Sequence, residues 1–459
     1  MELFNNILYF LIVIAVLVLI HEFGHFIAAR LSGMRTEIFS FGMGFRLFGY
    51  NKKTGFTFGS LPDDWDGGGY CDYRVCLFPV GGYVKISGMV DESMDTKFIN
   101  SAPQPYEFRS KNTFQKLFTI SAGVIMNFLL AVIIFGAISF FEGKVVWKTT
   151  TVGYVEKKSL GDIIGLQLND KILEINNKAV TTWNEVEEGL TLKDLGDTKS
   201  IKVFRNGNVQ TLTIEGKSTL RALVGKIPLG LSPGQIRVYI RDVETLSPAG
   251  KLGLTANDTI SAINGRQIAS FPELTSLLME YKSKKILLEW KRGNKIMTDS
   301  VVPTEAGKLG FIPGIHYSGA SEKISYSLFE ATANGFNETI KSIDLFWRSL
   351  VQIFKGNISA KESLGGPIMI AKSATQTAKL GFVSFMNFMA LLSITLAVIN
   401  ILPFPALDGG HLIFILVEAI IRREVPVKVK MVIQNFGLIV LLLLMVFMFY
   451  NDFARIFNF

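Results

Sequence analysis

Four long stretches without a charged side chain constrain the fold of this chain more than any other feature of its sequence. They run from Leu3 to Ile20, from Leu117 to Phe141, from Gly381 to Leu407 and from Met431 to Tyr450. Each is close to or above the roughly 18 residues that a helix needs to cross a bilayer. Because apolar residues make up 49% of the chain and charged residues only 19%, we predict a polytopic α-helical membrane protein with four transmembrane helices.

The first of these stretches leads into the motif His21-Glu22-Phe23-Gly24-His25. On a helix, His21 and His25 lie one turn apart on the same face, so both imidazoles can bind one Zn²⁺ while Glu22 stands beside the metal's water. An ionisable residue inside a membrane span costs roughly 2.5 to 3.5 kcal/mol, so three together persist mainly where they are paired, bind a metal or face water. A chance motif on an ordinary helix is therefore disfavoured, and the sequence predicts a hydrolytic zinc site inside the bilayer.

A catalytic zinc site normally has three protein ligands and a water in the fourth position, so the motif needs one more ligand. The chain has only four histidines; of the other two, His316 lies in polar sequence and His411 follows Asp408. Asp408 is the better candidate because it ends the uncharged third stretch and so places an acid at membrane depth. Taken alone, Asp408 could equally well cap a helix.

The backbone around Asp408 favours the metal site. Pro403 and Pro405 cannot continue a regular helix, and Gly409 and Gly410 permit a sharp turn. Irregular backbone is tolerated within a membrane only where protein buries it or water reaches it. We therefore expect this segment to line a cavity.

The sequence between the second and third stretches is more polar and repeats itself. Residues 159–185 align without a gap to residues 247–273, 88 positions later. Paired residues that recur in both copies include Gly165-Leu166 with Gly253-Leu254 and Asn169-Asp170 with Asn257-Asp258. Each copy continues into β-rich sequence with a glycine-containing tight turn. The pattern resembles a PDZ domain of the bacterial protease type and predicts two tandem α+β modules.

The sequence leaves the role of these modules open. PDZ domains bind extended peptides or chain ends by adding a strand to a sheet edge. Neither copy has an unmistakable carboxylate-binding loop, so the modules could bind peptides or act as steric bulk over the active-site entrance. After the second copy, apolar residues recur at helical spacing between charged ones over residues 329–354, which predicts an amphipathic helix. It could lie on the outer membrane surface as a hinge or gate, or pack against a soluble domain.

Four segments together resemble the site-2 protease family of intramembrane zinc metalloproteases. HEFGH and the later segment NILPFPALDGG at residues 400–410 match the two metal-binding segments of that family. Gly123 and Asn127 match its GxxxN element in the second span, and FPVGGYVK at residues 78–85 matches its membrane-associated β segment. The resemblance extends from the first span to the last.

The resemblance implies a site around one catalytic zinc ion, with ligands His21, His25 and Asp408 and with Glu22 as general base and acid. It also implies residues that bind substrate beside the metal, namely Asn400, Pro403, Pro405, Gly81, Gly82 and Tyr83. None of these positions departs from the family pattern, so an active zinc metalloendopeptidase is expected.

The predicted organisation has eight parts. Residues 1–30 form the first transmembrane helix, 31–116 a membrane-associated β region, 117–141 the second transmembrane helix, 142–224 and 225–310 two PDZ domains, 311–380 an amphipathic helical linker, 381–411 the third transmembrane helix and 431–450 the fourth.

Basic residues near the span ends predict the orientation. They gather in the first and last loops, at Arg30, Arg35, Arg109, Lys111, Lys116, Arg422, Arg423, Lys428 and Lys430. By the positive-inside rule these loops are cytoplasmic, so the active site lies near the cytoplasmic side and the PDZ pair on the opposite side. Together with the resemblance, two PDZ modules favour a Gram-negative inner membrane with a periplasmic PDZ pair.

The resemblance implies regulated intramembrane proteolysis within the lipid bilayer, with single-span proteins such as anti-sigma factors and signal-peptide remnants as substrates. The net charge of +8 is spread over loops, so we expect no nucleic-acid partner. Cys71 and Cys76 in a cytoplasmic loop are expected to be reduced thiols without a function. The alternative from another class is a non-hydrolytic PDZ adaptor with a structural zinc site; a zinc transporter is less favoured because the spans are almost entirely apolar.

Overall fold

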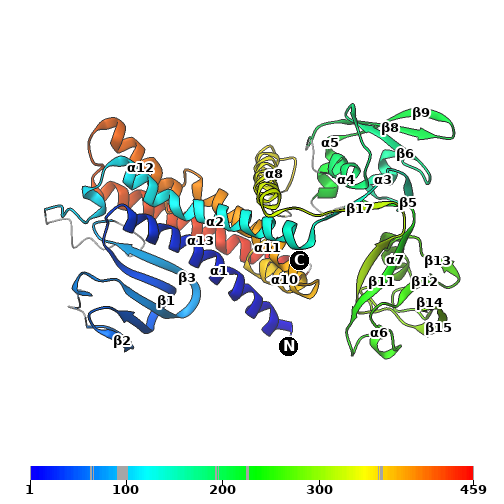
Figure 1. The fold of residues 1–459 in the computed structure, drawn as a ribbon, viewed down its shortest axis with the longest axis horizontal. Helices are drawn as coiled ribbons and strands as arrows, with labels where there is room; N and C mark the ends of the chain where they lie inside the picture. The colour runs from blue at the N-terminus through cyan, green and yellow to red at the C-terminus, as the bar shows by residue number, and fades with distance from the viewer. Residues whose placement is uncertain are drawn as a thin grey trace. The chain divides into compact units, whose positions relative to one another are not determined.

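The computed structural model describes residues 2–62, 65, 67–89, 102–191, 194, 196–223, 227–359, 361 and 365–457. The chain divides into two compact units (Figure 1). We call residues 1–142, 326–346 and 364–459 the membrane unit, and residues 143–325 and 347–363 the β-rich unit.

Among the described residues, four helices of the membrane unit are long and apolar enough to cross a membrane, which confirms the prediction of four apolar helices. They are α1 (Glu2–Leu31), α2 (Thr113–Glu142), α11 (Phe382–Ile401) and α13 (Val427–Phe457). The predicted third segment, residues 381–411, divides into α11, an irregular stretch from Leu402 to Leu407 and the beginning of α12 (Asp408–Ile421). The break follows from the two prolines, which have no N–H to continue the helical hydrogen bonds.

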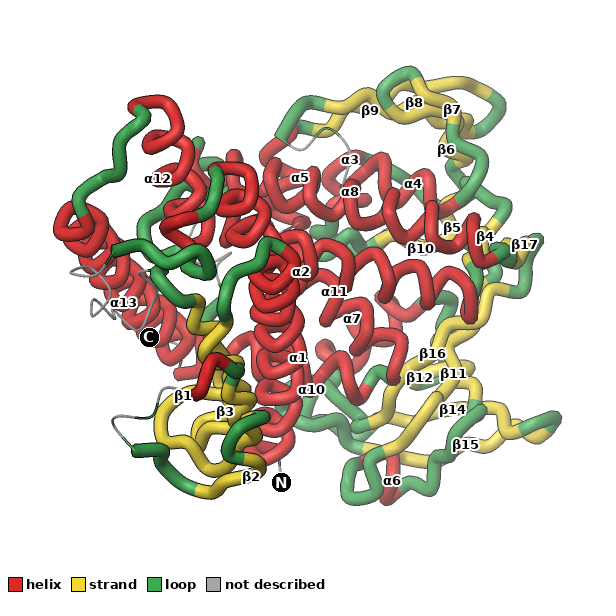
Figure 2. The backbone as a smooth tube through the Cα atoms, turned by 60° about the vertical axis from the view of Figure 1, so that its left-hand side comes forward, coloured by secondary structure: helices red, strands yellow, loops and turns green. Residues whose placement is uncertain are grey.

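Apolar side chains hold these helices together. Helix α2 lies between α1 and α11, and α10 (Pro367–Lys379) packs against α1 (Figure 2). The shared core includes Leu17 of α1, Ala131 of α2 and Ala390 of α11, all fully buried. The small alanines allow the helix backbones to approach closely, which positions α1 and α2 for the site described below.

A small sheet packs against α1 and comprises β1 (Thr36–Asn51), β2 (Gly55–Phe58) and β3 (Asp72–Ile86), in the order β2-β1-β3. Phe39 of β1 is paired with both Val84 and Tyr73 of β3, so the first half of β1 lies between the two halves of β3. Both long strands therefore bend. The bends contain Gly42, Gly44 and Gly81 in the left-handed region, with φ from 84° to 87°.

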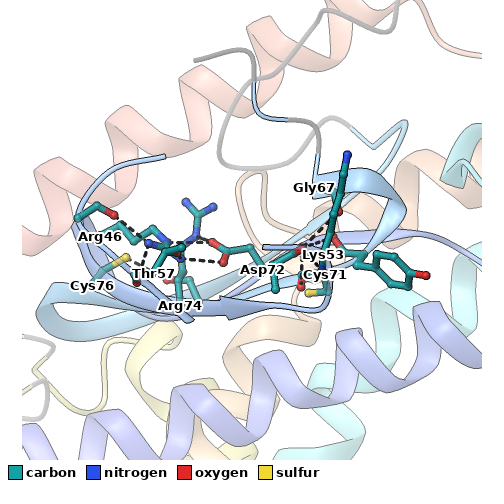
Figure 3. Close-up of polar contacts among 12 residues, drawn as sticks. Arg46, Lys53, Thr57, Gly67, Cys71, Asp72, Arg74 and Cys76 are labelled. Carbon is teal, nitrogen blue, oxygen red and sulfur yellow. Dashed lines mark hydrogen bonds and ion pairs between the residues drawn. The ribbon is translucent and has the colours of Figure 1, made fainter. Parts of the chain in front are cut away.

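A buried charge network fastens this sheet (Figure 3). Arg46 donates two hydrogen bonds to the Asp72 carboxylate, at 3.0 and 3.1 Å, and Arg74 donates a third at 2.7 Å. Asp72 is fully buried and Arg46 is only 5% exposed. Arg46 also donates to the carbonyls of Thr57 and Gly59, so one guanidinium ties three strands together.

We expect Asp72→Asn to destabilise the membrane unit by about 3 to 5 kcal/mol, because it leaves two guanidinium groups without their shared counter-charge in a buried site. The measurement is thermal unfolding of the full chain in detergent, followed by limited proteolysis. Glu338→Gln is the matched control, because it breaks an exposed Lys341 pair worth at most about 1 kcal/mol. Equal stability of the two variants would show that the network does not hold the sheet.

Both cysteines lie in this sheet region, buried and unbridged. Burial raises the pKa of the Cys71 thiol, which therefore stays protonated at neutral pH. Cys76 Sγ lies 3.3 Å from the Ser40 hydroxyl.

The β-rich unit contains two modules of similar composition. The first comprises β5 (Val152–Val155), α3 (Leu160–Ile164), β6 (Lys171–Ile175), β7 (Lys178–Ala179), α4 (Trp183–Thr191), β8 (Lys199–Arg205), β9 (Asn208–Ile214), α5 (Gly216–Leu223) and β10 (Leu231–Pro233). The second comprises β11 (Ile236–Val243), α6 (Pro248–Lys251), β12 (Thr259–Ile263), β13 (Arg266–Gln267), α7 (Phe271–Glu280), β14 (Ile286–Arg292), β15 (Lys295–Val301) and β16 (Phe311–Tyr317). A separate pair, β4 (Lys144–Trp147) and β17 (Ser321–Ile324), joins the two ends of this region.

Each module has its own apolar core and the same internal ion pair. Arg205 donates two hydrogen bonds to Asp170, and Arg292 donates two to Asp258, with both aspartates 1% exposed. These are the aspartates of the repeated Asn-Asp pairs, so the sequence repeat reflects a repeated structure.

The strand pairing moves two expected boundaries. Strand β10 lies beyond the expected end of the first module at residue 224, yet it pairs with β5. Residues 311–324, expected to begin a helical linker, form β16 and β17 instead. The reason is tertiary, since β16 completes the sheet of the second module by pairing with β11.

The amphipathic segment forms α8 (Leu328–Phe354). Its first part packs on α2, where Gly335 lies close to Gly136 and the Asn334 amide donates to the Ser139 hydroxyl at 2.8 Å. Apolar side chains on other faces of α8 are exposed, including Phe329 at 85%.

Candidate metal centre and active-site cavity

The two histidines of the HEFGH motif lie in α1, inside the apolar span and not beyond its end. Both imidazoles are buried, at 8% and 9% exposure, and their Nε2 atoms are 3.2 Å apart. The spacing of four residues brings both rings to one face of the helix, as expected.

Asp408, at the first position of α12, completes a cluster with these rings. Its Oδ2 lies 3.1 Å from His21 Nε2 and 3.5 Å from His25 Nε2. Ligand atoms around a tetrahedral zinc, at roughly 2.0 to 2.1 Å from the metal, are separated by about 3.3 Å. The three separations therefore suit one shared ion.

The hydrogen bonds of the cluster also suit a metal. Asp408 Oδ2 is buried and has no hydrogen-bond donor among the described residues, although two ring nitrogens lie beside it. His25 Nδ1 donates to the Thr119 carbonyl at 2.9 Å, which fixes the tautomer whose Nε2 carries a lone pair. The two Nε2 atoms and Asp408 Oδ2 are therefore acceptors that face one another with no proton between them, and a cation can bind all three. The donor set of two imidazoles and a carboxylate fits zinc.

Asn127 of the GxxxN element contacts the other imidazole, with its side-chain amide 3.3 Å from His21 Nδ1. The Oδ1 atom of Asn127 is buried and has no hydrogen-bond partner within the described part of the chain. The two orientations of an amide have the same shape, and turning Oδ1 towards His21 lets it accept the Nδ1 proton. His21 then has the same tautomer as His25, with Nε2 facing Asp408.

Glycine allows α1 and α2 to meet at the metal centre. A Cβ on Gly123 would lie 2.5 Å from His25 Nε2 and 2.8 Å from His21 Nε2, so only glycine fits there without displacing the rings. Gly24 makes the reciprocal close approach to the backbone of Ala122. The GxxxN element therefore contributes to the metal centre in two ways: Gly123 leaves space for the two rings, and the amide of Asn127 contacts His21.

The irregular stretch before Asp408 packs through glycine as well. Gly409 and Gly410 leave space for the carbonyls of Leu402 and Phe404, and Pro405 lies against Gly437 of α13. Ala406 has φ of 70°, a left-handed conformation that costs an L-residue of order 1 kcal/mol. Packing thus holds a strained turn two residues before the carboxylate.

A cavity of about 540 Å³ opens beside the cluster. Most of the expected site residues line it, namely His21, Glu22, His25, Asp408, Asn400, Gly81, Gly82 and Tyr83. Pro403 and Pro405 do not line it; they belong to the turn that carries Asp408. A Cβ on Gly82 would lie 3.6 Å from the Glu22 side chain, so the end of β3 borders the glutamate.

Two further polar residues line the same cavity. His411 Nε2 lies 3.1 Å from the side-chain amide of Gln434 on α13. From the sequence, His411 is a candidate only as a rival ligand to Asp408, and Gln434 is missed. Gln434 does carry a sequence signal, because it is a polar residue within the apolar fourth stretch.

Comparison with known proteins bears on the whole chain. The model of "Peptidase family M50" matches residues 9–444. A protein named as a candidate zinc metalloprotease from Neisseria meningitidis is 33% identical over 98% of this chain and 99% of its own length. The regulator of sigma-E protease RseP of Escherichia coli is 29% identical over 97% of this chain and 98% of its own.

Among solved structures, the PDZ domain of an SdrC-like protein from Listeria monocytogenes is 24% identical and covers 17% of this chain and 85% of that domain, with a TM-score of 0.16.

The family match spans far more than half of the sequence and includes every residue of the metal cluster. The resemblance to the site-2 protease family is confirmed. The motifs together with the two repeated modules resemble the regulator of sigma-E protease in particular, and this resemblance is confirmed as well. Membership decides against the adaptor alternative. The chain belongs to peptidase family M50, the site-2 type of zinc metalloprotease.

Proposed function

We propose that this protein is an intramembrane endopeptidase that cuts single-span membrane proteins within their transmembrane segments, with one zinc ion held by His21, His25 and Asp408. The observation that carries the proposal is the convergence of these three ligand atoms, all within 4.8 Å of one another, beside a cavity that Glu22 also lines. Family membership supplies the reaction class.

In this proposal Glu22 handles the proton. Bound zinc supplies Lewis acidity and lowers the pKa of a water molecule to roughly 7. Glu22 accepts the proton that the attacking water releases and then donates it to the nitrogen of the leaving amide. Thr119 and Asn127 hold the two imidazoles in position throughout, because each engages the ring nitrogen that faces away from the cluster.

The substrate must be extended before it can be cut. A transmembrane helix hides its carbonyls in internal hydrogen bonds, so the segment at the scissile bond has to unwind. Gly81, Gly82 and Tyr83 border the cavity at the end of β3, the terminal strand of its sheet. When the unwound substrate segment pairs with this edge, its backbone N–H and C=O groups form hydrogen bonds that hydrocarbon cannot provide. Asn400 contributes its amide from the end of α11, and Pro403 and Pro405 keep the next turn out of a helix.

We further propose an inner-membrane location with the metal centre near the cytoplasmic side, on the basis of the basic loops. Anti-sigma factors are the proposed substrate class, since one relative is named as a regulator of sigma-E protease. Signal-peptide remnants are a second class, because they too are short apolar helices with little mass outside the membrane.

The two modules of the β-rich unit are proposed to be tandem PDZ domains that filter or bind substrate. Support comes from their repeated sequence, separate cores and repeated Arg-Asp pairs. A filter would exclude a single-span protein that still carries a folded domain outside the membrane.

The test uses the full chain in proteoliposomes with two substrates that share one span, where one carries a folded outer domain and the other a short tail. We expect a cut inside the span, lost on chelation and restored by zinc, and at least about tenfold faster for the short-tailed substrate. Mass spectrometry of the products locates the cut. A cut outside the span would refute intramembrane proteolysis, whereas equal rates would refute only the filter.

A further inference from the structure

Strands β10 and β16 hold equivalent places in the two modules. Each follows a loop with a left-handed glycine, Gly230 with φ of 61° and Gly310 with φ of 82°. Each is also the terminal strand of its sheet, since β10 pairs with β5 and β16 pairs with β11. A terminal strand is where an incoming peptide adds to a PDZ sheet.

The loop before β10 directs three successive N–H groups outward. The carbonyls of residues 228–230 accept hydrogen bonds from the backbone N–H groups of Leu160, Gly161 and Glu156 within the module. In a trans peptide unit the N–H points opposite to the C=O. The N–H groups of residues 229–231 therefore point away from the module body.

The loop before β16 repeats this arrangement. The carbonyls of residues 308–310 accept from the N–H groups of Thr304, Ala249 and Glu244. Ala249 and Glu244 stand 88 positions after Gly161 and Glu156, their counterparts in the first module. Thr304 belongs to the same turn as residue 308, so two bonds to the module body are repeated, and the N–H groups of residues 310 and 311 point outward as well. Successive N–H groups around a left-handed glycine form an anion-binding nest, and a terminal carboxylate matches it.

The next outward position in each strand is a proline. Pro233 stands opposite Val152, and Pro313 stands opposite Ile240. The N–H and C=O of Val152 bond to residues 170 and 169, and those of Ile240 bond to residues 258 and 257. Neither pair is therefore hydrogen-bonded across the ladder, and both prolines direct their backbone nitrogen to the open edge.

A proline at that position ends strand addition. It keeps an acceptor, but it lacks the N–H that would bond to the second rung of an added strand, and its ring occupies the same space. Both modules have this residue at the third position after the loop glycine. The edges thus offer a nest for a carboxylate and almost no ladder beyond it.

We propose that Pro233 and Pro313 restrict each module to the free carboxyl end of a polypeptide chain, bound through its last one or two residues, and exclude internal strands. The proposal rests on the proposed role of the modules as PDZ domains. It assigns specificity to two residues outside the metal centre. Peptide side chains further from the carboxyl end contribute little to affinity. The modules therefore recognise a free chain end with little preference for the sequence before it.

The test measures binding to the full chain in detergent with fluorescent octapeptides that differ in their last residue. For the tightest of them, a dipeptide with the same ending should bind within about twofold, and amidation of its carboxyl end should abolish binding. Residue 313 faces the third residue from the chain end, because hydrogen-bonded positions recur at every second residue of a strand. Pro313→Ala, which restores the donor, should therefore tighten the octapeptide about fivefold, the value of one net hydrogen bond, and leave the dipeptide, which lacks that residue, unchanged. Pro233→Ala tests the first module in the same way, and Pro303→Ala, outside both edges, is the control.

Each contrary outcome would refute a different part of the proposal. If the native chain binds the octapeptide far more tightly than the dipeptide, or if neither proline variant binds the octapeptide more tightly than the native chain does, the restriction by proline is wrong while peptide binding stands. If no peptide binds to any variant, the carboxylate nest is wrong as well, and the modules act only by bulk. Cleavage of the short-tailed substrate is measured in parallel, so that failure of the protease proposal is seen separately.

Discussion

Replacing Glu22 with glutamine will abolish cleavage of a single-span substrate while zinc stays bound. Glutamine has nearly the shape of glutamate but cannot accept a proton at neutral pH, so the attacking water loses its base. Loss of a positioned general base costs about 10²- to 10⁴-fold in rate. The three ligand atoms belong to other residues and are unchanged, so metal binding should persist.

The experiment compares cleavage rates of the native chain and Glu22→Gln in proteoliposomes, together with zinc content by elemental analysis. Glu338→Gln is the control. It removes an exposed carboxylate of α8, and residue 338 is not among the residues that line the cavity. Cleavage by Glu22→Gln at a rate near the native one would exclude it as the base. Loss of zinc together with activity would instead make Glu22 part of the metal centre.

Gly123→Ala will release zinc although it changes no ligand. The added Cβ would stand 2.5 Å from His25 Nε2 and 2.7 Å from His21 Cε1, well inside van der Waals contact. Both rings must move, and the buried carbonyl and amide that hold them leave little room. Disturbing the shell around metal ligands typically costs 10- to 100-fold in affinity, so at least about 100-fold is expected where both rings are displaced.

Zinc affinity of the purified chain, measured by competition with a chelating dye, checks this result. Gly136→Ala in the same helix is the matched control, because its Cβ meets nothing closer than 3.4 Å and should leave zinc bound. Thermal unfolding of both variants separates loss of metal from loss of fold. Native affinity in Gly123→Ala would mean that α1 and α2 separate easily at the metal centre.

The local features of this protein can be predicted from its amino-acid sequence alone. Uncharged length is sufficient to identify four membrane helices, and a spacing of four residues is sufficient to bring His21 and His25 to one helix face. Asp408 was predicted because an acid at membrane depth needs a partner. The repeat of 88 residues likewise showed that two similar modules follow each other.

Features that depend on packing between distant segments are visible only in the folded structure. No local pattern states that the Thr119 carbonyl holds His25, that Gln434 joins the cavity, or that β16 completes a sheet begun at β11. Pro233 and Pro313 face outward because the residues opposite them, Val152 and Ile240, form their backbone hydrogen bonds with other segments. Periodicity describes one element at a time, whereas these contacts arise between elements, whose packing short-range propensities do not specify.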